Sequence, residues 1–300
     1  MEGSVLTKVV LPIALGVVML GLGLSLQLAD FARAVKQPKA VIVGLLCQLV
    51  LLPALGFAIA GAFGLASGIA IGLVILSLCP GGVTSNVFSF LSRGDLALSI
   101  TLTAITSLVT PFTIPLLAGI AFKLFGVEGS KISLPILKTI GTLVLITIVP
   151  VSIGMAIRAK APGFAKKSER PVSILSLLFL ILIIAGVIRN EWNNIPGYFL
   201  QAGWAGLTLN LVSMGIGFGL GLILKLRRAE SITIGIEVGI QNGTTALFIT
   251  STLLESPEMS IAPAIYSLLM FGTGALFGVL VNIGRPKEAA NRVEDSADID

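Results

Sequence analysis

The sequence of 300 residues contains no histidine and only two cysteines. It therefore lacks the commonest zinc ligand and the usual imidazole base, and Cys47 and Cys79 stand apart in apolar runs, so neither a metal cluster nor a thiol redox motif is encoded. Charged residues are scarce at 12%, against 55% hydrophobic residues and a mean hydropathy of +1.02. This composition excludes a soluble globule and predicts an all-α polytopic membrane protein embedded in a lipid bilayer.

Nine apolar runs are long enough to cross a membrane, which takes about 20 residues. Their approximate bounds are 5–28, 39–63, 68–91, 95–122, 134–158, 171–188, 200–224, 231–254 and 260–282. The chain begins without the basic segment and cleavage pattern of a signal peptide, so we expect the first run to be a retained helix. Residues 1–284 are predicted to form one transmembrane domain, and the charged residues 285–300 a disordered cytoplasmic tail.

Most of the 20 basic residues fall in every second connector, for example at Arg93, Lys166 and Arg227. The opposite connectors carry few basic residues and include Glu255 and Glu258. The positive-inside rule therefore places the N-terminus outside and the C-terminus in the cytoplasm, as expected for a protein of the cell inner membrane. Because these charges form no continuous face, nucleic-acid binding is not predicted. Three aromatic residues of the outer side are interpreted as an interfacial belt: Trp192, Tyr198 and Trp204.

Glu237 is the one charged side chain well inside an apolar run. A carboxylate there costs roughly 2.5–3.5 kcal/mol on insertion scales, so it predicts a functional site unless it serves only as glue between helices. Its run is interrupted by glycine and amide residues at 239–245, and another run is interrupted by Pro80-Gly81-Gly82. Both interruptions release main-chain groups at mid-membrane depth, which protein, water or ligand must satisfy.

The two interrupted runs are five segments apart, so the chain crosses the membrane in opposite directions at the two. This predicts inverted halves at about 5–122 and 171–282, joined by a linking helix at 134–158. Paired broken segments in inverted halves mark the binding site of a secondary transporter. The alternative is that each interruption is only a packing kink.

Oxygen-bearing residues gather around these interruptions. A carboxylate, amide oxygens, hydroxyls and freed carbonyls suit sodium, whereas a proton carrier more often shows a second acid or a histidine in the membrane. Ser99 and Thr103 stand four apart on one helix face and can point at one spot, although either hydroxyl can instead bond its own helix. Gln48 has an alternative role as interhelical glue. The amino ends of the half-helices would suit a carboxylate or sulfonate of a substrate.

Two stretches carry most of these groups: Pro80-Gly81-Gly82-Val83-Thr84-Ser85-Asn86 and Glu237-Val238-Gly239-Ile240-Gln241-Asn242. They are similar to the two signature stretches of the bile acid:sodium symporter family, and the resemblance covers nearly the whole chain. It implies a panel domain and a core domain in which the two broken helices cross beside two sodium sites.

The resemblance also implies the residues of each site. The first sodium is expected at Ser85, Asn86, Ser99, Thr103 and Glu237. The second is expected at Gln48, Glu237, Gln241 and the main-chain carbonyls of Val238 and Ile240. Substrate is expected next to the crossing, with Thr84 and Asn242 as its nearest polar groups.

The panel is predicted to consist of runs without an interruption, namely 5–28, 134–158 and 171–188. The run at 260–282 is expected to lie between the panel and the core. The run at 200–224 carries a stripe of small residues: Gly215, Gly217, Gly219 and Gly221. Such a stripe predicts close helix packing, or a surface on which the two domains slide.

These features predict a sodium-coupled symporter that imports an organic anion, such as a bile acid or a small carboxylate, by alternating access. An enzyme is not predicted, and no obligate protein partner is indicated. One alternative is a proton-coupled or efflux carrier of an organic anion, which would lack part of the oxygen set. The other is a channel or receptor without coupled transport, which would show rings of polar side chains along several helices.

The topology leads to a labelling prediction. Lys166→Cys should react with a membrane-impermeant maleimide only from the cytoplasmic side, and Glu258→Cys only from outside, because basic connectors remain in the cytoplasm. Labelling of intact cells and of inverted vesicles, in a chain with Cys47 and Cys79 replaced by alanine, measures both. Reaction of both cysteines from one side would contradict the predicted spans.

Overall fold

The computed structural model describes residues 6–126, 135–190, 197 and 199–283, and these residues contain helices and no strand. Seven continuous helical stretches are long and apolar enough to cross a membrane, and they match seven of the nine predicted runs. They are Lys8–Ser25, Pro38–Ala62, Leu96–Phe125, Ile136–Lys160, Pro162–Gly186, Phe199–Ile223 and Pro257–Leu280. The two remaining runs are each divided into shorter pieces. Trp192, Tyr198 and the predicted tail lie outside the described residues.

Three of the long helices contain a widened, π-helical turn at a proline. They are η1 (Leu6–Val10) with α2 (Leu11–Ser25), α4 (Pro38–Leu46) with η2 (Cys47–Leu51) and α5 (Leu52–Ala62), and α9 (Ile136–Leu143) with η3 (Val144–Ile148) and α10 (Val149–Lys160). Each widened turn ends two residues before Pro12, Pro53 or Pro150. Proline has no N–H and its ring clashes with the carbonyl four residues earlier, so the turn before it widens. The turn before Pro53 carries Gln48.

Two predicted boundaries are wrong. Residues 29–36, predicted as part of a connector, belong to α3 (Leu28–Lys36), and α11 (Pro162–Asn190) begins nine residues before its predicted start at 171. Hydropathy alone misses both because each segment mixes charged and apolar residues, which lowers its mean hydropathy. The Asp30 carbonyl of α3 accepts a hydrogen bond from Thr101 of α8 (Leu96–Phe125) at 3.0 Å. Glu169, near the start of α11, forms an ion pair with Arg158 at 2.8 Å.

The interrupted runs form two broken helices at the centre of the structure. The first consists of α6 (Ser67–Ser77) and α7 (Val83–Leu91), and the second of α14 (Arg228–Gly239), α15 (Gly243–Leu247) and η5 (Phe248–Leu253). Residues 68–77 and 230–239 are all buried, as expected for helices packed on every side. η4 (Phe199–Gly203), α13 (Trp204–Ile223) and α16 (Pro257–Leu280) complete the described chain.

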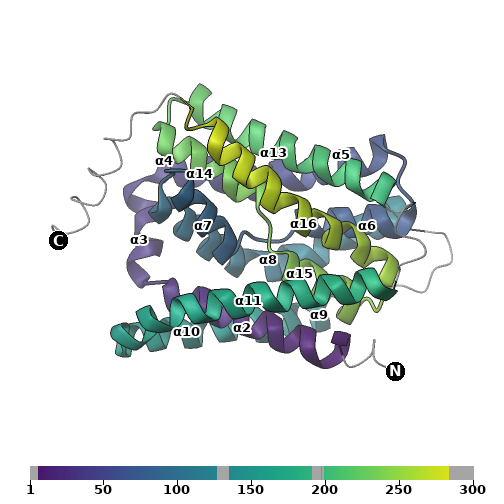
Figure 1. Ribbon diagram of the computed structural model, residues 1–300, viewed down its shortest axis with the longest axis horizontal. Helices are drawn as coiled ribbons and strands as arrows, with labels where there is room; N and C mark the ends of the chain where they lie inside the picture. Colours follow the sequence, from purple (N-terminus) through teal and green to yellow (C-terminus); the bar gives the residue numbers. More distant parts are fainter. Residues whose placement is uncertain (1–5, 127–134, 191–196, 198, 284–300) are drawn as a thin grey trace.

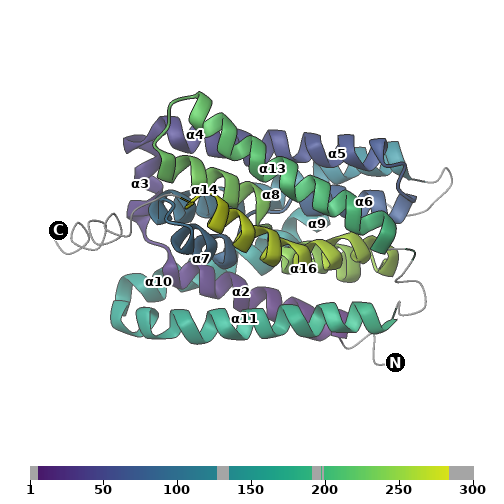
Figure 2. The ribbon, with the colours of Figure 1, turned by 45° about the horizontal axis from the view of Figure 1, so that its top comes forward.

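The helices form two layers (Figures 1 and 2). α2, α10 and α11 pack on one another in a panel layer, as predicted, and the other helices surround the broken pair as a core. Within the panel layer, a Cβ at Gly23 of α2 would overlap the main chain of Val151 in α10. Two glycines of the α13 stripe pack inside the core instead, because Gly217 and Gly221 lie against the main chain of α14, whereas a Cβ at Gly215 or Gly219 would meet nothing within 4 Å. These two glycines therefore serve close packing and not a sliding surface between the layers.

Several connectors with basic residues lie together at one end of the molecule, on the left in Figure 1. There Arg227 forms an ion pair with Asp95 at 2.8 Å, and Arg228 donates to the Val281 carbonyl at 2.9 Å. Asn282 likewise donates to the carbonyl of Ser92 at 2.8 Å. We call this end the basic side. Its residues join the start of α8, the start of α14 and the end of α16.

The contact between α2 and α10 leads to a stability prediction. Gly23→Val should lower the melting temperature of the detergent-solubilised protein, because overpacking typically costs about 1–3 kcal/mol and the main chain of Val151 cannot rotate away. Gly16→Val in the same helix should have little effect, since nothing lies within 4 Å of a Cβ there. Equal losses in the two variants would show that helix propensity, and not packing, sets the effect.

Candidate functional site

The two broken helices meet at their non-helical segments. Residues 78–82 separate α6 from α7, residues 240–242 separate α14 from α15, and the N–H of Asn242 donates to the carbonyl of Pro80 at 2.9 Å. Asn242 Oδ1 also caps the next helix by accepting from the N–H of Thr245 at 3.0 Å. Ser85 closes the start of α7, since its hydroxyl lies 2.8 Å from the carbonyl of Gly82. Main-chain groups released by one break are thus partly satisfied by the other.

The first predicted oxygen cluster is assembled around Glu237. Its carboxylate is 0% exposed, and Oε2 lies 2.9 Å from Ser99 Oγ, while Oε1 accepts from Thr103 Oγ1. Ser99 Oγ is also 2.9 Å from Asn86 Oδ1, and Ser85 Oγ is 3.4 Å from Thr103 Oγ1. Helices α7, α8 and α14 therefore bring all five predicted residues together. The hydroxyls of Ser99 and Thr103 bond Glu237, so the prediction that they share one target is confirmed.

This cluster is rich in hydrogen-bond acceptors. Ser99 has one hydroxyl proton, yet both Glu237 Oε2 and Asn86 Oδ1 are within its reach. All described partners of the carboxylate are neutral hydroxyls, so its negative charge has no positive partner among them. A buried charge without such a partner is strongly unfavourable. The arrangement therefore has the chemistry of a site for a small cation.

Gly81 makes the close approach of the broken helix to this carboxylate possible. A Cβ at this position would overlap Glu237 Oε1 and would lie 3.0 Å from Ser85 Oγ. Only glycine leaves room for the carboxylate beside the main chain of the break.

The second predicted cluster surrounds Gln48 and Gln241. Gln48 Nε2 donates to Gln241 Oε1 at 2.8 Å and to the Cys79 carbonyl at 3.0 Å. Gln241 Nε2 donates to the carbonyls of Val238 at 2.7 Å and Glu237 at 3.1 Å. Glu237 joins this group through its main chain, whereas the described hydrogen bonds of its carboxylate run to the first cluster. The contacts of Gln48 also fit the alternative role, in which its hydrogen bonds only hold neighbouring helices together.

One acceptor of the second cluster has no partner. Gln48 is 1% exposed, and its Oε1 makes no hydrogen bond in the described structure. Ile240 lies at the same break, fully buried, and its N–H donates to the carbonyl of Ile236 at 2.7 Å. An unpartnered oxygen beside freed main chain has the character of a cation ligand.

Sequence reasoning missed the residues that hold the end of α14. The carbonyl of Gly239 accepts hydrogen bonds from Asn210 Nδ2 and from the Tyr266 hydroxyl, both at 2.8 Å. Ser213 Oγ lies 3.5 Å from the carbonyl of Val238. These residues could have been found as amide or hydroxyl side chains within the apolar runs at 200–224 and 260–282.

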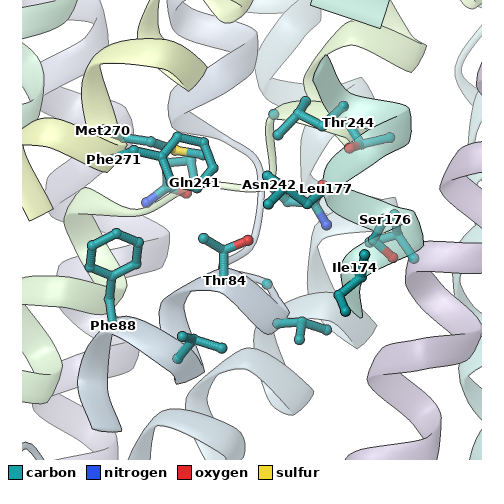
Figure 3. A pocket seen from close by; sticks show the side chains of 16 residues that line it. Thr84, Phe88, Ile174, Ser176, Leu177, Gln241, Asn242, Thr244, Met270 and Phe271 are labelled. Carbon is teal, nitrogen blue, oxygen red and sulfur yellow. The ribbon is translucent and has the colours of Figure 1, made fainter. Parts of the chain in front are cut away.

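A cavity of about 260 Å³ lies next to the crossing, between the panel layer and the core. It extends along α7 toward the basic side, and its walls are mostly apolar: Val18, Val83, Val87, Phe88, Ile174, Leu177, Leu180, Met270 and Phe271. The side chains of Thr84 and Asn242 face each other across it, with the Asn242 nitrogen directed into the cavity (Figure 3). Asn242 is 6% exposed, and its Nδ2 has no hydrogen-bond partner in the described structure. Thr84 and Asn242 thus line a cavity at the crossing, and their contact with a substrate stays a prediction.

Comparison with known proteins agrees with this geometry. Residues 12–197 match the model of the Sodium Bile acid symporter family. The human protein named "Ileal sodium/bile acid cotransporter" is 30% identical over 280 residues, which are 91% of this chain and 79% of the relative. The Bacillus subtilis (strain 168) protein named "Uncharacterized sodium-dependent transporter YocS" is 30% identical over 262 residues, 85% of this chain and 78% of the relative. Together with the crossing of two broken helices, these matches show that the chain is a multi-pass membrane protein and belongs to the sodium bile acid symporter family.

Proposed function

We propose that this protein is a sodium-coupled symporter that imports an organic anion by alternating access. The observation that carries the proposal is the fully buried carboxylate of Glu237, surrounded by hydroxyl and amide oxygens without a described positive partner. Sodium would supply the missing charge. The printed names of two relatives, a sodium-dependent transporter and a sodium/bile acid cotransporter, support the same coupling.

The two oxygen clusters are proposed as two sodium sites. The first offers the carboxylate of Glu237 with oxygens of Ser85, Asn86, Ser99 and Thr103. The second offers the side-chain oxygens of Gln48 and Gln241 and main-chain carbonyls of Glu237, Val238 and Ile240. Oxygen donors of this kind suit a hard cation, and the absence of formal charge from the second set makes it the weaker site.

The cavity supports an organic anion with an apolar part as substrate. Its lining residues are uncharged, so an anionic group would be bound by hydrogen-bond donors, of which Asn242 Nδ2 is buried and unpartnered. The helix that begins at Val83 adds main-chain N–H groups and the positive end of its dipole. Apolar side chains of α7, α11 and α16 would contact the remainder of the molecule. The printed name of the human relative gives a bile acid as one example.

Alternating access is proposed as movement between the panel layer and the core. The cavity lies between these layers and extends toward the basic side, which the positive-inside rule assigns to the cytoplasm of a cell inner membrane. In this proposal residues 5–122 and 171–282 are inverted halves of one transmembrane domain, with the N-terminus outside. Access from the other side would require the layers to separate there.

Removal of the buried charge tests the sodium assignment. Glu237→Gln keeps the shape of the side chain but should abolish sodium-driven uptake and the rise in melting temperature with sodium, since a ligand stabilises only a protein that binds it. The measurement compares sodium chloride with choline chloride at equal ionic strength, and Glu258→Gln at an exposed position serves as control. Normal sodium dependence in Glu237→Gln, or its absence in the wild type, would contradict the proposal.

Replacement of the unpartnered donor tests the substrate assignment. Asn242→Asp and Asn242→Ser keep an oxygen that can cap the next helix but remove Nδ2. We expect the half-saturating concentration of the transported anion to rise at least about tenfold, because a hydrogen bond to a charged group contributes roughly 1.5–3 kcal/mol. Uptake of labelled anions, from pyruvate to a bile acid, measures this, while sodium stabilisation should persist. Unchanged half-saturation in both variants would place the anion elsewhere.

A further inference from the structure

A second, much smaller cavity lies on the other side of the crossing. Its volume is about 10 Å³, which is room for one water-sized particle. It lies between the panel layer and the core, and most of its polar lining consists of hydroxyls: Ser107, Thr110, Thr147 and Thr245. We call it the seam cavity.

Two of these hydroxyls are buried and have no partner. Ser107 is 3% exposed and Thr245 is 2% exposed, and neither Ser107 Oγ nor Thr245 Oγ1 makes a hydrogen bond in the described structure. Buried polar atoms of native proteins are rarely left unsatisfied, so two such atoms lining one cavity indicate a small polar occupant. Thr147 differs, because its hydroxyl donates to the carbonyl of Leu143 at 2.6 Å.

The sequence of α8 connects this cavity to the carboxylate of Glu237. Ser99, Thr103 and Ser107 are spaced four residues apart, so they lie on one face of the helix at steps of about 6 Å. The first two contact Glu237, and the third lines the seam cavity. Pro111 follows Ser107 by four residues and has no N–H for the Ser107 carbonyl, which leaves a further acceptor at this step.

We propose that the seam cavity is a third, transient cation position through which sodium passes between the side opposite the basic side and the Glu237 cluster. This inference rests on the proposed function. The site offers neutral oxygens and no carboxylate, so a cation there would be held weakly and released readily, as conduction through successive sites requires. The unpartnered hydroxyls of Ser107 and Thr245 would be its side-chain ligands. The Glu237 cluster, with its formal charge, remains the site of stable binding.

The test separates the rate of sodium entry from sodium affinity. Ser107→Ala with Thr245→Val should lower the initial uptake rate at limiting external sodium about fivefold or more, because both side-chain ligands of the proposed position are removed. At saturating sodium the rate should approach that of the wild type. The sodium concentration that gives half of the maximal rise in melting temperature of the purified protein should change less than twofold. Right-side-out membrane vesicles with a labelled anion that the wild type transports give the uptake rates.

Two variants serve as controls. Thr106→Val removes a buried hydroxyl that donates to the Leu102 carbonyl of the same helix and does not line the seam cavity, so it should leave uptake at limiting sodium unchanged. Thr245→Ser keeps the hydroxyl and should lose less uptake at limiting sodium than Thr245→Val. If the double variant does not accumulate, the pair Thr245→Val and Thr245→Ser should show the same contrast with a smaller change.

Two results would overturn the third site while wild-type uptake remains sodium-dependent. In the first, the double variant behaves as Thr106→Val, which means that the cavity holds only a water molecule. In the second, uptake at limiting and saturating sodium and the sodium affinity all fall together, which means that the hydroxyls have a structural role. Sodium-independent uptake by the wild type would instead contradict the proposed function itself.

Discussion

The carboxylate of Glu237 is the constraint on which the centre of this structure depends. It is fully buried and its described partners are hydroxyls without charge, so the surrounding chain has to supply oxygen, space and hydrogen-bond donors. α8 contributes Ser99 and Thr103 one turn apart, and the break before α7 contributes Gly81, where a side chain would collide with the carboxylate. Without a counter-ion, a buried carboxylate would destabilise the helix bundle. A cation bound to the folded protein would offset this loss of stability.

The main-chain polar groups at the breaks in the two helices are also mostly hydrogen-bonded within the protein. Most released main-chain groups find a partner within the core, as at the Asn242 to Pro80 hydrogen bond and at the Gly239 carbonyl, which accepts from Asn210 and Tyr266. The buried side-chain atoms without a partner in the described structure include two at the crossing, Gln48 Oε1 and Asn242 Nδ2. One is an acceptor next to freed carbonyls and the other a donor facing a cavity. Their opposite hydrogen-bonding roles match a cation and an anion as the two kinds of ligand.

The sequence alone could predict those features of the structure that depend on residues close together in the chain. The apolar runs, the interruptions, the buried acid and the four-residue spacing of Ser99 and Thr103 are all visible in short windows. The structure confirms the all-α class and brings both hydroxyls to Glu237. Amphipathic α3 and the polar start of α11 were missed because hydropathy averages over both faces of a helix. Asn210 and the α11 and α16 walls of the cavity could not be placed, since their contacts join segments far apart in the chain.

The Glu237 carboxylate and the unpartnered donor Asn242 Nδ2 are close together in the sequence. This closeness explains how binding of the ion and binding of the substrate can be linked. Asn242 follows Glu237 by five residues, across the break that begins after Gly239, and Gln241 fixes this segment by donating to the carbonyls of Glu237 and Val238. The position of Asn242 Nδ2 in the cavity therefore depends on the geometry around the carboxylate. In the proposed mechanism, sodium would relieve the unbalanced charge that disfavours this geometry and would prepare the donor for an anion. By thermodynamic reciprocity, an anion bound to Asn242 would then increase the affinity for sodium by the same factor.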